Sequence, residues 1–133
     1  MGTRIDMIGL FVENLQNMVV FYRDILGFET DWDGSGPYAE FKQEGVRFSM
    51  YERAQLAALL GQPPSYPTGV NGTFEIAIDL PSSSEVDREF ARVVAAGAQP
   101  IYYPRNEPWG MRSSMVADPE GNLIEIGSWN IEE

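Results

Sequence analysis

The chain has 133 residues, with 20 acids against nine bases and a net charge of −11 at neutral pH, so its surface is unsuited to nucleic acid or to an anionic membrane. It contains neither histidine nor cysteine, which excludes a Ser-His-Asp triad, disulfides, thiolate metal sites and a cysteine nucleophile. No apolar run approaches the roughly 18 residues that span a bilayer, and the N-terminus shows no signal-peptide pattern, so we expect a cytoplasmic protein.

The first part of the chain reads as one strand, one helix and three strands. Asn14 is suited to cap the helix, apolar residues then recur at helical spacing, and Gly27 is placed to end it. The segment 33–37 (Asp-Gly-Ser-Gly-Pro) predicts a turn. The expected elements are a strand over 5–12, a helix of about twelve residues, and strands over 28–32, 38–42 and 46–51.

The middle of the chain interrupts this order. Alanine and leucine predict a short helix over 53–60. Proline and glycine in 61–69 indicate a linker, or equally an ordered lid over a site.

The same order then returns. We expect a strand over 73–80, a helix capped by Ser84 and ended by Gly97, and strands over 99–103, 110–117 and 122–128, with a loop at 104–108. Met7 and Glu75 hold corresponding places in the two leading strands, as Ser49 and Glu125 do in the two last strands. This predicts a duplicated βαβββ unit in one α+β domain over 1–133, with units of about 1–52 and 72–133 and a linker over 53–71.

Alternation gives each sheet two different faces. The apolar face, which must pack on the helices, comprises Ile8, Leu10, Val12, Phe48, Met50, Phe74, Ile76, Ile78, Ile124 and Ile126. The opposite face comprises Met7, Gly9, Phe11, Arg47, Ser49, Tyr51, Glu75, Ala77, Asp79, Leu123, Glu125 and Gly127. Its mixture of acids, aromatics and small residues indicates a site lining or a plain solvated face, and Phe11, Met7 and Leu123 favour the site.

The chain resembles a known superfamily through particular segments. These are the βαβββ repeat, Phe21–Phe28 in the first helix, Pro108-Trp109-Gly110, and the segment from Asp118 through Gly121 to Glu125. They are similar to the vicinal oxygen chelate superfamily, which includes glyoxalase I, bleomycin-resistance proteins, fosfomycin-resistance enzymes and extradiol dioxygenases. The resemblance implies cupped mixed sheets with helices on the outer faces, a ligand in the cup, and often a homodimer.

The resemblance also implies where a metal would bind. The family's metal enzymes use four residues, typically His or Glu, from the first and last strands of each unit. Those places fall here on Met7, Ser49, Glu75 and Glu125. A thioether and a neutral hydroxyl are poor ligands for a hard cation, so only the two glutamates are good ones. We therefore expect no cofactor; a divalent metal on Glu75 and Glu125 is possible but not favoured.

The expected function is metal-independent small-molecule binding of the bleomycin-resistance type, with a cationic or aromatic ligand. The expected ligand-binding residues are Met7, Phe11, Arg47, Ser49, Glu75, Trp109 and Glu125. Trp109 suits ligand stacking or packing in the core or at the rim, Trp32 and Tyr38 could line the first cup, and Arg47 and Arg112 could pair with the two glutamates. The alternatives are a divalent-metal lyase or dioxygenase-like enzyme, and a silent accessory protein. No catalytic residue is identified.

Overall fold

The computed structural model describes residues 2–132, which form two compact units, one reaching to Tyr66 and the other beginning at Pro67. Each unit contains one four-stranded mixed sheet and follows the order βαβββ, which confirms the predicted α+β duplication. The boundary lies within the predicted linker 53–71, whose first half is the helix α2 (Arg53–Leu60) as expected.

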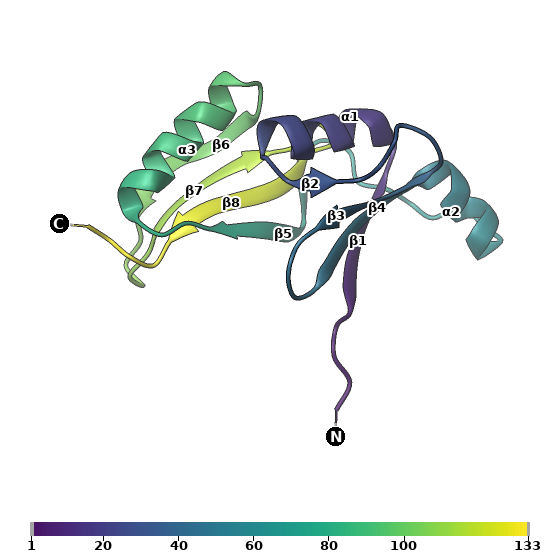
Figure 1. Ribbon diagram of the computed structural model, residues 1–133, viewed down its shortest axis with the longest axis horizontal. Coiled ribbons are helices and arrows are strands. Elements are labelled where there is room, and N and C mark those ends of the chain that lie inside the picture. Colours follow the sequence, from purple (N-terminus) through teal and green to yellow (C-terminus); the bar gives the residue numbers. More distant parts are fainter. Residues whose placement is uncertain (1, 133) are drawn as a thin grey trace. The chain divides into compact units, whose positions relative to one another are not determined.

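Unit 1 is the segment up to Tyr66. Its sheet has the order β1-β4-β3-β2, in which β1 and β4 are parallel and the other neighbours antiparallel, with α1 packed on β3 and β4 (Figure 1). Its elements before α2 are β1 (Met7–Val12), α1 (Leu15–Val20), a π-helical segment (Phe21–Ile25), β2 (Glu29–Thr30), β3 (Tyr38–Lys42) and β4 (Arg47–Glu52).

The first helix begins and ends where the sequence predicts, but it changes type halfway. The Asn14 side chain accepts a hydrogen bond from the Asn17 backbone N–H at 3.0 Å, the expected cap. From Phe21 onward the turn widens, and the backbone N–H of Leu26 bonds the carbonyl oxygen of Phe21. Gly27 then takes a φ of 82°, which a residue with a side chain adopts at a cost.

Unit 2 begins at Pro67 and repeats this topology. Its sheet order is β5-β8-β7-β6, again with the first and last strands parallel, and α3 packs mainly on β6, β7 and β8 (Figure 1). Its elements are β5 (Asn71–Asp79), α3 (Ser83–Ala95), β6 (Gln99–Asn106), β7 (Arg112–Ala117) and β8 (Asn122–Ser128). No helix in residues 2–132 is long and apolar enough to cross a membrane.

Two predicted boundaries in unit 2 are wrong. The N-cap of α3 is Ser82, because the backbone N–H and hydroxyl of Ser84 instead bond the carboxylate of Glu132. β6 continues to Asn106 through the predicted loop, because register irregularities absorb Pro104 within the β6–β7 pairing.

The residues of the predicted apolar faces are buried only on the parts of the sheets that a helix covers. Leu10, Val12, Phe48, Met50, Ile124 and Ile126 are buried, as expected. Phe74, Ile76 and Ile78 are half-buried because β5 is an edge strand beside the area that α3 covers. Ile8 is 43% exposed, contrary to expectation, because β1 is the edge strand of the other sheet and α1 lies over β3 and β4.

The turn between β7 and β8 is a buried polar network. The carboxylate of Asp118, only 3% exposed, accepts hydrogen bonds from the backbone N–H groups of Glu120 and Asn122 and from the Asn122 side chain, at 2.9–3.0 Å. Asn122 accepts in turn from the Asn71 side chain at 3.0 Å. A side chain on Gly121 would collide with the backbone of Gly69. This segment therefore ties the start of β5 to the last hairpin, which is a structural role.

Candidate functional site

The open face of each unit is the sheet face opposite α1 or α3. On unit 1 the strand register places Met7 beside Arg47, Gly9 beside Ser49 and Phe11 beside Tyr51. The middle strand β3 adds two residues, since Tyr38 lies opposite Tyr51 and Glu40 opposite Ser49. The predicted residues Met7, Phe11, Arg47 and Ser49 therefore share this face.

Met7 and Ser49 are engaged with each other. The Ser49 hydroxyl donates to the Met7 sulfur at 3.2 Å, and Ser49 is only 2% exposed. The Tyr38 hydroxyl lies 3.7 Å from the same sulfur and 2.7 Å from the Glu40 carboxylate. A side chain on Gly9 would stand 3.1 Å from the Ser49 oxygen, so the strand passes close to this pair. This part of the face offers neutral atoms with little freedom to bind anything else.

Arg47 and Arg112 form their ion pairs with residues other than Glu75 and Glu125. Arg47 forms ion pairs with Asp6 at 2.7 Å and with Glu40 at 2.8 Å, within its own unit. Asp6 reaches it because Asp6 precedes β1, where strand alternation no longer decides the side. Arg112 lies on the helix side of β7 and pairs with Asp87 of α3 at 2.8 Å.

The open face of unit 2 carries Glu75 and Glu125 together. Glu75 lies opposite Leu123 and Glu125 opposite Ala77, so the two glutamates are diagonal neighbours on the parallel strands β5 and β8. Such neighbours are within reach of each other for long side chains. On the other side of β8, Met115 of β7 lies directly opposite Glu125.

The pKa of Glu125 is raised above the ordinary glutamate value. Partial burial contributes most, because it disfavours the charged form, and the negative charges of Glu75 and Glu107 add to it. Glu125 is thus an acid that holds its proton to a higher pH than a solvated glutamate does. A carboxyl group of this kind can hydrogen-bond a ligand as a donor or attract a cation once ionised.

Glu107 reaches this face from the loop after β6 and is fixed there by several contacts. Its side chain, 8% exposed, forms an ion pair with Arg105 and accepts from the Ser113 hydroxyl at 3.0 Å. Ser113 accepts from the Tyr102 hydroxyl at 3.1 Å, and the Arg105 guanidinium lies 4.1 Å from the centre of the Tyr102 ring. The hydrogen bond from Arg105 is the main cause that lowers the pKa of Glu107. Glu107, which favours the charged form, therefore lies near Glu125, which keeps its proton to a higher pH.

Two aromatic residues of β6 and the loop after it differ in position. Trp109 is 60% exposed in the turn that joins β6 to β7, where Gly110 N–H bonds the carbonyl oxygen of Glu107, so it does not pack in the core. Tyr103 lies on the helix side and packs on Phe90 of α3, with ring centres 5.2 Å apart. Trp109 therefore remains a candidate for stacking on a ligand.

Four residues of the open faces were not predicted from the sequence, and they lie on β3, on β7 and in the loop after β6. Glu40, Ser113 and Met115 would have been found by assigning faces to β3 and β7 as well as to the outer strands. Glu107 had no signal, because its approach to Glu125 depends on how the β6–β7 connection folds back.

The family follows from comparison with known proteins. The model of the glyoxalase/bleomycin resistance protein/dioxygenase superfamily matches residues 4–126. The chain belongs to this superfamily. No curated protein matches it in sequence.

Solved structures of the superfamily share the fold. The chain is similar to a glyoxalase/bleomycin resistance protein/dioxygenase from Nocardioides, with a TM-score of 0.81 and 25% identity over 98% of this chain and 85% of that one. A lactoylglutathione lyase from Agrobacterium tumefaciens has a TM-score of 0.72 and 20% sequence identity, over 96% of this chain and 94% of that one. TioX from Micromonospora sp. ML1 has a TM-score of 0.65 and 23% sequence identity, over 96% of this chain and 98% of that one. Neighbours with such different names show the fold, and they leave the activity open.

The residues at the superfamily's metal positions do not fit a divalent cation well. Unit 1 supplies the Met7 thioether and the Ser49 hydroxyl, which are hydrogen-bonded to each other. Unit 2 supplies two carboxylates, and its third, Glu107, is already held by Arg105 and Ser113. Within the described part of either unit, no group of three or more Asp or Glu side chains is arranged to hold a metal. Two carboxylates fall short of the about six to eight oxygen ligands that Ca²⁺ takes, and with waters they would hold Mg²⁺ only weakly.

Proposed function

We propose that this superfamily member is a metal-independent small-molecule binding protein of the bleomycin-resistance type, which holds its ligand on the open faces without transforming it. The contact between Ser49 and Met7 carries this proposal, because a sulfur and a hydroxyl that are already hydrogen-bonded to each other stand at two positions that the resemblance assigns to metal ligands. Such atoms suit an organic ligand, which needs shape and a few polar contacts, better than a cation.

The ligand's chemistry follows from the open face of unit 2. Glu75, Glu107 and Glu125 give it a negative potential, which favours a ligand with a cationic group. The exposed indole of Trp109 provides a surface for an aromatic part of the same ligand. A compound with a flat ring and an amine matches both features.

A homodimer belongs to the proposal. The edge strand β1 exposes Met7 and Phe11 on the open face by 38% and 45%, and Ile8 on the other face by 43%. Exposed apolar side chains along an edge strand favour burial against a second copy. Light scattering should give twice the chain mass of 14.9 kDa, and a monomer at micromolar concentration would contradict this part. We also propose a cytoplasmic location, because the chain contains no cysteine.

A ligand screen by thermal shift, run with chelator and again with divalent metals, tests the proposal. Cationic aromatic compounds should raise the melting temperature equally in both conditions. The double variant Glu75→Gln with Glu125→Gln should lose most of that shift, whereas Glu44→Gln, in an exposed turn, should keep it.

The alternative is a divalent-metal lyase or dioxygenase-like enzyme that uses Glu75 and Glu125. About one tightly held metal ion per chain by elemental analysis, removed by the double variant, would establish it and would overturn the binding-protein proposal.

A further inference from the structure

A hollow lies in unit 1, at the end of the sheet and away from its open face. The parallel strands β1 and β4 finish side by side, with Val12 opposite Glu52, and the chain then leaves in two directions, into α1 and into α2. Diverging connections at the carboxyl ends of parallel strands leave a crevice. Here it has a volume of about 730 Å³ and is closed on its third side by the turn between β2 and β3.

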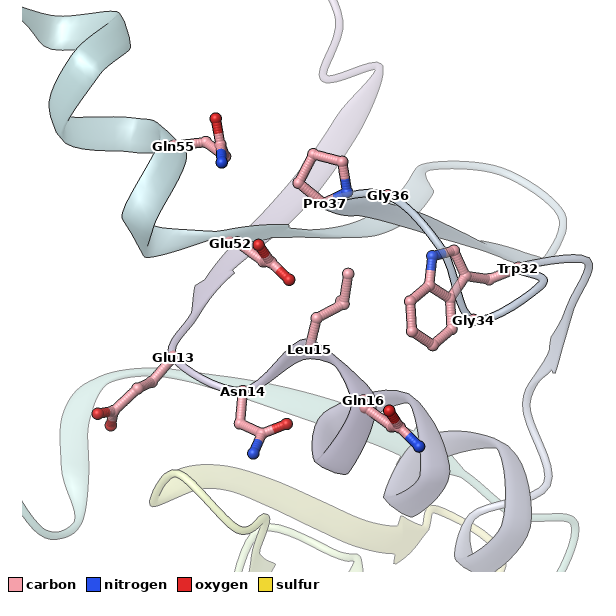
Figure 2. Close-up of a pocket in the computed structure, with 10 residues that line it drawn as sticks. All are labelled: Glu13, Asn14, Leu15, Gln16, Trp32, Gly34, Gly36, Pro37, Glu52 and Gln55. Atoms are coloured by element: carbon pink, nitrogen blue, oxygen red, sulfur yellow. The ribbon is translucent and has the colours of Figure 1, made fainter.

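The walls of this hollow combine one apolar side chain, one indole and one carboxylate. Figure 2 shows Leu15 pointing into its centre, with Trp32 on one side and the carboxylate of Glu52 on the other. Leu15 is 2% exposed, so it forms a firm apolar floor. The other lining residues are Glu13, Asn14, Gln16, Gly34, Gly36, Pro37 and Gln55.

One acidic side chain of the hollow lacks a cationic partner among the described residues. Glu52 is half-buried and caps α2 by position, yet its side chain makes no capping hydrogen bond and takes part in no ion pair. A ligand that brings a cationic group to this carboxylate therefore gains affinity.

The charges of the hollow define the ligand. Its described lining includes no base, and of its two acids only Glu52 faces the hollow, because the carboxylate of Glu13 points away from it (Figure 2). The adjacent Arg53 donates from Nε to the Phe11 carbonyl oxygen at 3.0 Å, and its guanidinium lies 4.3 Å from the centre of the Tyr66 ring. A carboxylate facing an indole across an apolar floor is the arrangement that binds an organic ammonium group.

We propose that this hollow is a binding site for a small organic ammonium compound. The ammonium group pairs with Glu52, and the carbon skeleton packs on the Trp32 ring. This site is separate from the open faces and does not depend on the function proposed for them.

Tyramine and tyrosol form a matched pair of probes, since both carry a phenol and they differ in an amine against an alcohol. The chain has three tryptophans, and the indole N–H resonance of Trp32 is assigned by its loss in Trp32→Phe. Tyramine should shift that resonance along a saturable curve in the millimolar range, and tyrosol should bind about fivefold or more weakly.

Two variants locate the charge. Glu52→Gln should weaken tyramine about fivefold or more, while Glu13→Gln, whose carboxylate points away from the hollow in Figure 2, should change it little. The double variant at Glu75 and Glu125 should leave this binding intact, which separates it from the open face of unit 2.

Equal binding of the two probes, equal effects of the two single variants, or no saturable shift of the Trp32 resonance would overturn the proposal. The probe comparison uses the unaltered protein, so it decides the question even if a variant folds poorly.

Discussion

Replacing Asp118 by Ala tests whether the turn between β7 and β8 is a structural network. The carboxylate accepts three hydrogen bonds, from the backbone N–H of Glu120 and from two donors of Asn122. Asn122 is 7% exposed, so both of its donors would lose their partner without reaching water, whereas the half-buried Glu120 can be hydrated. A buried donor left unpaired costs about 1–3 kcal/mol, and the two together should cost about 3–4 kcal/mol.

Asp33→Ala is the matched control. Asp33 also accepts two hydrogen bonds in a turn, from the backbone N–H and hydroxyl of Ser35, but the whole turn is exposed. Both variants remove one negative charge from a chain of net charge −11, so the general effect of charge cancels. The control should change stability little, because water replaces the lost acceptor.

Urea unfolding followed by circular dichroism gives both values. With a slope of about 2 kcal/mol per molar, Asp118→Ala should lower the midpoint by about 1.5–2 M. A loss below about 1 kcal/mol, or one equal to that of Asp33→Ala, would refute the reasoning, since burial would then have no consequence at this turn.

Three further outcomes are expected. Glu125→Gln should raise the melting temperature at about pH 7 more than at about pH 4. The folded-state pKa of Glu125 is raised by burial and by Glu75, so the stability that its proton gives is lost as pH rises through that pKa; an equal effect at both pH values would contradict this. Gly121→Ala should cost about 2–4 kcal/mol in urea unfolding, since it adds a collision to the strain of a positive φ, and Gly45→Ala, with φ of 85° and open space, should cost about 1 kcal/mol. Phe48→Ala should cost about 3–5 kcal/mol, because its ring packs on Tyr22 and Phe41 at 5.6 and 5.4 Å, and a loss under about 1 kcal/mol would mean that the core refills the cavity.

Local signals account for what the sequence predicted well. Alternating strands and turn residues fixed the bounds of 38–42 and 122–128 correctly, and helix propensity did so for 53–60. These features depend on neighbours along the chain, as does the assignment of Met7, Ser49, Glu75 and Glu125 to sheet faces. The prediction failed at Ser84, where a contact with Glu132 far along the chain overrides the local capping preference.

The sequence by itself determined the duplicated βαβββ order and the faces on which Glu75 and Glu125 lie, because both follow from periodicity within single elements. Only the tertiary structure decided which side chains meet: Asp6 with Arg47, Asn71 with Asn122, Glu107 near Glu125, and Trp32 facing Glu52 across the hollow. The members of these groups are far apart in sequence or joined through loops. Their meeting depends on strand pairing and loop closure, whose free energy is set by the whole unit and not by local propensity.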